Sequence, residues 1–135
     1  MSVAVVYWSQ TGNTEAMANI LAEACGGEAI SWDSFAADKV AEYDALAFGC
    51  PAMGDEELDP DFEELWDACK GKLDGKPVVL FGSYDWGTGE WMDTWRDEAS
   101  TCGCSMPAEP VICNATPDAE GGAQCEALGK ALAEA

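Results

Sequence analysis

Residues 3–14 read Val-Ala-Val-Val-Tyr-Trp-Ser-Gln-Thr-Gly-Asn-Thr, an apolar segment followed by a polar one. Its first part, residues 3–8, is a short and nearly continuous apolar run with β-branched members, which is typical of a strand buried on both faces. Residues 14–25 then carry apolar side chains at helical spacing, and Gly26-Gly27 ends the segment. The stretch therefore predicts a buried strand, a polar loop and a covering helix.

The same alternation recurs along the rest of the chain. Strand patterns lie at residues 28–32, 44–49, 77–82 and 110–113, and helical patterns lie at 60–70, 90–101 and 118–134, with room for a short helix at 38–43. Alternating strands and helices imply right-handed crossovers and a parallel sheet covered by helices. We therefore predict an α/β fold, a doubly wound five-stranded parallel sheet with helices on both faces, forming one domain over residues 1–135.

The charge balance narrows the possible partners. Six Lys and Arg residues against 26 Asp and Glu residues give a net charge of −20, which disfavours binding to nucleic acid or to an anionic membrane. Basic surfaces are the natural partners, and solubility alone is the other explanation of the acid excess. Residues 1–8 lack the basic start of a secretory signal, and no apolar run approaches the roughly 18–20 residues that cross a bilayer. We expect a cytoplasmic protein.

The chain has seven cysteines and no histidine. Because the count is odd and no export signal is evident, we expect reduced thiols that pack as small apolar side chains. The closest pair, Cys102 and Cys104, lacks the two-residue spacing of a redox or zinc site. The sequence therefore predicts no metal site.

The loop after the first strand reads Ser9-Gln10-Thr11-Gly12-Asn13-Thr14 and leads into a helix. Hydroxyl groups, backbone N–H groups and the positive end of a helix dipole together form a cradle for an anion. No Lys or Arg lies nearby, so neutral donors would hold a monophosphate, although an ordinary helix cap is the other interpretation. The loop lacks the Gly-rich run before Lys of a triphosphate site and the three spaced glycines of a dinucleotide site. A mononucleotide is favoured.

Two further loops follow predicted strands, at the sheet edge where ligands bind in this class of fold. The segment Cys50-Pro51-Ala52-Met53-Gly54-Asp55-Glu56-Glu57 combines an apolar side chain, a glycine and carboxylates. The segment Ser83-Tyr84-Asp85-Trp86-Gly87-Thr88-Gly89 sets two aromatic residues among glycines. A loop tryptophan set among glycines, as Trp86 is, is unusual for packing. The remaining tryptophans are expected in the core or on helix faces: Trp8, Trp32, Trp66, Trp91 and Trp95.

These loops carry a family resemblance. Thr11-Gly12-Asn13-Thr14, Ala52-Met53-Gly54-Asp55-Glu56, and Phe81-Gly82-Ser83-Tyr84 with Trp86-Gly87 resemble the three FMN loops of short-chain flavodoxins. The similarity in order and spacing extends over essentially the whole chain. It implies a flavodoxin-like fold, FMN as the cofactor, and a low-potential one-electron carrier that cycles between semiquinone and hydroquinone and is not an enzyme.

The resemblance also implies a role for each loop. Residues 9–14 would hold the phosphate with help from Ser83, and Met53 and Trp86 would sandwich the isoalloxazine ring. Glu56 would accept a hydrogen bond from flavin N3, and the main chain of residues 85–89 would face the pyrimidine end. Gly54 would turn its carbonyl toward N5–H, which needs a residue that tolerates positive φ. The implied cofactor-binding residues are Ser9, Gln10, Thr11, Gly12, Asn13, Thr14, Ala52, Met53, Gly54, Asp55, Glu56, Ser83, Tyr84, Asp85, Trp86 and Gly87.

The resemblance also implies a monomer that docks transiently, by electrostatic attraction, on redox enzymes with basic surfaces. Two alternatives stay open at this point. An FMN-dependent NAD(P)H or quinone reductase would share the phosphate loop and the fold, because fold alone does not fix function. A ligand-free interaction domain would carry no chromophore.

Overall fold

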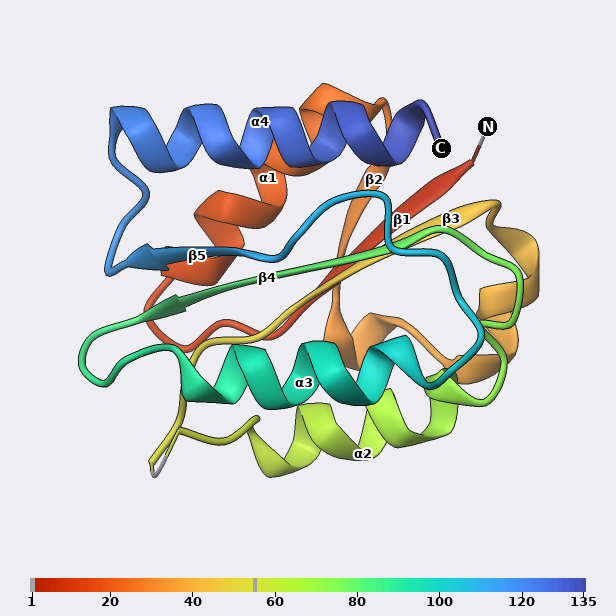
Figure 1. Ribbon diagram of the computed structural model, residues 1–135, viewed down its shortest axis with the longest axis horizontal. Coiled ribbons are helices and arrows are strands. Elements are labelled where there is room, and N and C mark those ends of the chain that lie inside the picture. Colours follow the sequence, from red (N-terminus) through yellow and green to blue (C-terminus); the bar gives the residue numbers. More distant parts are fainter. Residues whose placement is uncertain (1, 55) are drawn as a thin grey trace.

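The computed structural model describes residues 2–54 and 56–135, and its strands and helices alternate along the chain (Figure 1). The strands are β1 (Val3–Tyr7), β2 (Glu28–Ser31), β3 (Ala45–Gly49), β4 (Val78–Tyr84) and β5 (Val111–Asn114). The α-helices are α1 (Asn13–Cys25), α2 (Pro60–Lys70), α3 (Glu90–Ser100) and α4 (Ala119–Ala133). Two 3₁₀ helices, η1 (Trp32–Ser34) and η2 (Ala37–Glu42), lie between β2 and β3.

The five strands form one parallel sheet in the order β2-β1-β3-β4-β5. This confirms the predicted α/β fold. From β1 the chain moves outward to β2 and then returns across β1 to β3, so the winding direction reverses between β1 and β3. The loops that leave the carboxyl ends of these two strands diverge, which makes this edge the expected binding crevice.

The helices cover both faces of the sheet, as predicted (Figure 1). Successive side chains along a strand point to opposite faces, and β3 shows this clearly. Ala45 and Ala47 pack in the cluster beneath α1 and α4, whereas Leu46 and Phe48 pack beneath α2 and α3. A strand buried on both sides must be apolar throughout, which explains why the sequence shows continuous apolar runs.

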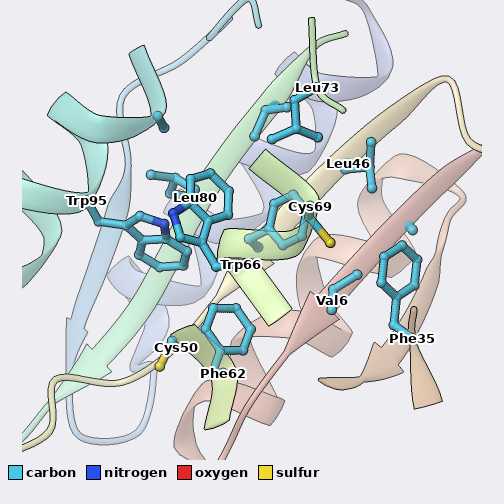
Figure 2. Close-up of a cluster of buried hydrophobic side chains, with 14 of the residues drawn as sticks. Val6, Phe35, Leu46, Cys50, Phe62, Trp66, Cys69, Leu73, Leu80 and Trp95 are labelled. Atoms are coloured by element: carbon cyan, nitrogen blue, oxygen red, sulfur yellow. The ribbon is translucent and has the colours of Figure 1, made fainter. Parts of the chain in front are cut away.

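Aromatic side chains fill the layer beneath α2 and α3 (Figure 2). The ring of Trp66 lies edge-on to Trp95 and to Phe48, with centroid distances of 5.7 and 5.3 Å. Such pairs stabilise a fold by about 0.5–1.5 kcal/mol beyond the burial of area. Trp66, Trp91 and Trp95 are buried, which confirms their predicted place in the core. This packing fixes α2 and α3 against the strands that carry the candidate site.

The structure differs from the predicted elements in two places. The short helix between β2 and β3 is the 3₁₀ helix η2, in which Val40 alone is buried, so no continuous apolar stripe holds an α-helix there. Strand β4 runs two residues past the predicted end, because Ser83 and Tyr84 pair with Cys113 and Asn114 of β5. Two predicted loop residues, Ser83 and Tyr84, therefore lie on a strand.

Candidate cofactor site

The loop after β1 is organised around the Ser9 hydroxyl. Ser9 Oγ accepts hydrogen bonds from the backbone N–H of Gly12 at 3.1 Å and of Glu15 at 3.3 Å. Gln10 and Thr11 are exposed at the tip, and Asn13 begins α1. The loop thus brings its polar side chains to the N-terminus of a helix, where backbone N–H groups have no partner within the helix. This is the arrangement of the predicted anion cradle.

A buried pair of hydroxyls joins this loop to β4. Thr14 Oγ1 and Ser83 Oγ lie 2.7 Å apart, and the two residues are only 1% and 4% exposed. The structure therefore brings Ser83 to the first loop, although 69 residues separate it from Thr14. On the other side of the loop, Thr116 Oγ1 donates to Asn13 Oδ1 at 2.8 Å. Thr116 was not among the predicted site residues, although it follows the fifth strand at the same edge of the sheet.

The loop after β3 folds into a tight turn. Met53 and Glu57 exchange two backbone hydrogen bonds of 2.9 Å, and the N–H of Ala52 donates to the Ser83 carbonyl at 3.0 Å. Gly54 and Glu56 have φ values of +47° and +57°. A non-glycine residue in this region is uncommon and costs about 1–3 kcal/mol, so other contacts must hold Glu56 in place. Asp55, a predicted site residue, lies outside the described residues.

Glu56 bridges this turn to the loop after β4. Its Oε1 accepts a hydrogen bond from the backbone N–H of Thr88 at 2.6 Å, a contact between two loops that was not predicted from the sequence. Gly87 has a φ of +98°, and a Cβ there would lie 1.8 Å from the same Oε1, so only glycine fits. The other oxygen, Oε2, is buried and has no partner among the described residues. A buried acceptor without a hydrogen bond destabilises the fold by about 1–3 kcal/mol, so we expect a ligand to donate a hydrogen bond to this oxygen.

The third loop presents an aromatic ring to solvent. Trp86 is 64% exposed and is the exposed large hydrophobic residue found in the described part of the chain. Its neighbours Asp85 and Gly87 are also exposed. Tyr84 instead turns inward, with its ring 5.9 Å from that of Trp91. The structure therefore places Trp86 as a free stacking surface and Tyr84 as a half-buried support.

The surroundings of the site favour binding over covalent chemistry. Burial raises the pKa of the Cys50 thiol to about 12, so this thiol stays protonated at neutral pH and supplies no nucleophile. Within residues 2–54 and 56–135, no group of three or more His, Cys, Asp or Glu side chains is placed to hold a metal ion. In the same residues, no helix is both long and apolar enough to cross a membrane.

Residues 5–129 match the family model described as Flavodoxin. The chain belongs to the flavodoxin family. It is 42% identical to a flavodoxin from Megasphaera elsdenii, with 98% of this chain and 99% of that protein covered. It is 38% identical to a flavodoxin from Clostridium beijerinckii, with 96% and 97% covered. The solution structure of two-electron reduced Megasphaera elsdenii flavodoxin has a TM-score of 0.90 at 43% identity, covering 98% of this chain and 99% of that one.

Membership in the flavodoxin family fixes the cofactor and the class of function. Flavodoxins bind FMN and transfer electrons, and the chain is an FMN-binding electron carrier rather than an enzyme. The size fits the short-chain form, and the reductase alternative is not favoured. The residues present fit the group, because the buried Glu56 Oε2 has no donor among residues 2–54 and 56–135 and the Trp86 ring is exposed.

Proposed function

We propose that the three loops at the carboxyl ends of β1, β3 and β4 hold one FMN and that the protein passes electrons singly at low potential. The observation that carries the assignment is the buried Glu56 Oε2, which has no partner among the described residues and belongs to a carboxylate hydrogen-bonded to the loop that carries the exposed Trp86. FMN, when bound, supplies the redox chemistry, and the protein supplies binding, orientation and electrostatics. The proposed binding residues are Ser9, Gln10, Thr11, Gly12, Asn13, Thr14, Ala52, Met53, Gly54, Asp55, Glu56, Ser83, Tyr84, Asp85, Trp86 and Gly87.

Each part of the site has a distinct task. Residues 9–14 bind the phosphate through hydroxyl and backbone N–H donors, with no cation in the loop. Met53 and Trp86 cover the two faces of the ring, and Glu56 Oε2 accepts N3–H. The Gly54 carbonyl would accept a hydrogen bond from flavin N5–H, which needs a residue whose peptide can turn at positive φ. The carboxylates of these loops would disfavour added negative charge on the flavin and so would lower its reduction potential.

Replacing Thr11 and Thr14 together with alanine is expected to weaken FMN binding roughly fivefold to hundredfold. Each hydroxyl contributes about 0.5–1.5 kcal/mol, and 1.4 kcal/mol is a factor of ten in affinity. Titration of the apoprotein with FMN and with riboflavin measures the effect. Only FMN affinity should fall, because riboflavin has no phosphate.

Thr101→Ala is the matched control, because its hydroxyl bonds to the Glu98 carbonyl at the far end of α3. An equal loss for FMN and riboflavin in the Thr11 and Thr14 variant would show that the hydroxyls support the loop and do not bind phosphate.

Trp86→Ala is expected to make the bound flavin more fluorescent and more weakly held. The indole is 64% exposed, so its removal leaves no core cavity and the change reports on the ring contact. Loss of the stacked pair costs roughly 0.5–1.5 kcal/mol beyond area. Steady-state flavin emission and the dissociation constant measure both effects. Trp86→Phe keeps a π face, so its flavin emission and dissociation constant should lie between those of the wild type and of Trp86→Ala. Unchanged flavin emission and FMN affinity in Trp86→Ala would show that the indole does not contact the flavin ring.

The distribution of charge supports docking by the cofactor end of the molecule. The loops 9–14, 50–57 and 83–89 contain no Lys or Arg, and the first cation in the chain is Lys39. Lys70 ends α2 and Lys76 precedes β4, at the opposite edge of the sheet (Figure 1). This asymmetry would steer a basic partner toward the FMN end of a monomer.

Electron transfer to a lysine-rich c-type cytochrome, used as a probe acceptor, is expected to slow as salt rises from low ionic strength to 0.5 M. The Debye length shortens from about 10 Å at 0.1 M to about 3 Å at 1 M, so steering is screened. Stopped-flow absorbance measures the electron-transfer rate at each salt concentration. Asp85→Asn should lower the low-salt rate more than Asp74→Asn, which removes the same charge before β4. The docking proposal would be wrong if the electron-transfer rate did not depend on salt, or if Asp85→Asn and Asp74→Asn lowered the low-salt rate equally.

We also infer one domain over residues 1–135 and a place in a reducing compartment such as the cytoplasm. Helices α1 and α4, from the two halves of the chain, pack side by side over the same face of the sheet (Figure 1). The seven cysteines are all free thiols, which supports a reducing environment.

A further inference from the structure

A fourth loop reaches the phosphate cradle from the carboxyl end of β5. Thr116 Oγ1 donates a hydrogen bond of 2.8 Å to Asn13 Oδ1, although 103 residues separate the two along the chain. Asn13 is the first residue of α1, and Gly12 before it supplies no side-chain cap to the helix. Thr116 therefore contacts a side chain at the N-terminus of α1, where the phosphate is proposed to bind.

The backbone on both sides of Thr116 is anchored. On one side, Ala115 has a φ of +56°, a value that a non-glycine residue keeps only where surrounding contacts hold it. Its N–H donates to the Tyr84 carbonyl at 2.7 Å, which supplies such a contact. On the other side, the Asp118 side chain caps α4 through a hydrogen bond of 2.7 Å. Because the chain is held at both neighbours, Thr116 loses little conformational freedom when it contacts Asn13.

The contact decides which end of the Asn13 amide can meet an anion. An Asn side chain carries an oxygen that only accepts hydrogen bonds and a nitrogen with two N–H donors. Thr116 donates to the oxygen, so the nitrogen is the end that can donate to a phosphate. The loop at residues 9–14 contains no Lys or Arg, so neutral donors of this kind must supply the binding.

We propose that Thr116 is a positioning residue for the cofactor phosphate. Its hydroxyl fixes the Asn13 amide so that the amide nitrogen donates to the phosphate, and Thr116 acts through Asn13 and not on the phosphate itself. The inference rests on the proposed phosphate role of residues 9–14, and it adds the loop after β5 to the site. Because Thr116 is exposed, replacing it opens no cavity in the core.

Thr116→Val removes the hydroxyl, keeps the branched shape, and is expected to weaken FMN binding roughly twofold to tenfold. Titrations of the apoprotein with FMN and with riboflavin measure the effect, and riboflavin affinity should stay unchanged because riboflavin has no phosphate. The phosphorus NMR shift of bound FMN should also change. Thr116→Ser keeps the hydroxyl and should restore the FMN affinity and the shift. Thr101→Val is the matched control, because it removes a hydroxyl at the far end of α3.

A double-mutant cycle tests whether Thr116 acts through Asn13. Asn13→Ala removes the amide, so adding Thr116→Val to it should cause no further loss of FMN affinity. Losses that add in the double variant would overturn the proposal, because Thr116 would then act by another route.

The wild-type titrations separate two kinds of failure. If the wild type binds riboflavin as tightly as FMN, residues 9–14 do not bind phosphate and both proposals are wrong. If the wild type prefers FMN and Thr116→Val keeps the same preference, only the role of Thr116 is wrong. An equal loss of FMN and riboflavin affinity in Thr116→Val would also overturn that role, because Thr116 would then only support the loop.

Discussion

Gly87→Ala is expected to weaken FMN binding roughly tenfold to hundredfold. A Cβ at this position would lie 1.8 Å from Glu56 Oε1, so the carboxylate must leave its contact with the Thr88 N–H. A hydrogen bond to a charged group contributes about 1.5–3 kcal/mol, and the φ of +98° adds strain for any side chain. Because Glu56 Oε2 is the proposed acceptor for N3–H, displacing the carboxylate also removes a ligand contact. Fluorescence titration of the apoprotein with FMN measures the loss.

Gly71→Ala serves as the control, because its φ is −75° and a Cβ there meets nothing within 4 Å. It should bind FMN like the wild type. If Gly87→Ala also bound FMN within twofold of the wild type, Glu56 would have no part in the site.

Gly54→Val is expected to narrow the gap between the two one-electron midpoint potentials by roughly 40–130 mV. Gly54 has a φ of +47° and open space around it, so valine acts through the backbone and not through a clash. A β-branched residue at positive φ costs about 1–3 kcal/mol, and 59 mV corresponds to a factor of ten for one electron. The turned peptide that accepts N5–H is thereby disfavoured. Anaerobic potentiometry measures both potentials.

Gly75→Val is the matched control for this prediction. Gly75 also has a positive φ, +78°, and open space, but it lies before β4 at the opposite edge of the sheet. Both variants should lose stability, and only Gly54→Val should change the potentials. If each of the two midpoint potentials were the same in Gly54→Val, Gly75→Val and the wild type, the Gly54 carbonyl would have no redox role.

The order of the elements follows from the sequence because strands buried on both faces must be apolar throughout. Residues 3–8 and 77–82 therefore mark β1 and β4 to within a residue or two. The loops that carry the site follow from those strands, since carboxyl ends of parallel strands share one edge. The fold and the three loops were thus predictable from local patterns.

The contacts that assemble the site were not predictable in the same way. The Glu56 contact with Thr88 and the Thr14 contact with Ser83 join residues far apart in sequence. They depend on how the loops converge after the sheet has formed. The extension of β4 to Tyr84 likewise depends on pairing with β5, which no local pattern in residues 83–84 reports.

A stepwise anaerobic titration of the purified protein with dithionite, followed by absorbance, distinguishes a one-electron carrier from a two-electron reductase. We predict one FMN per chain and two separated one-electron steps, with a long-wavelength band that rises during the first step and falls during the second. A direct passage from oxidised to fully reduced flavin, with no such band, would contradict a one-electron carrier and favour a two-electron reductase.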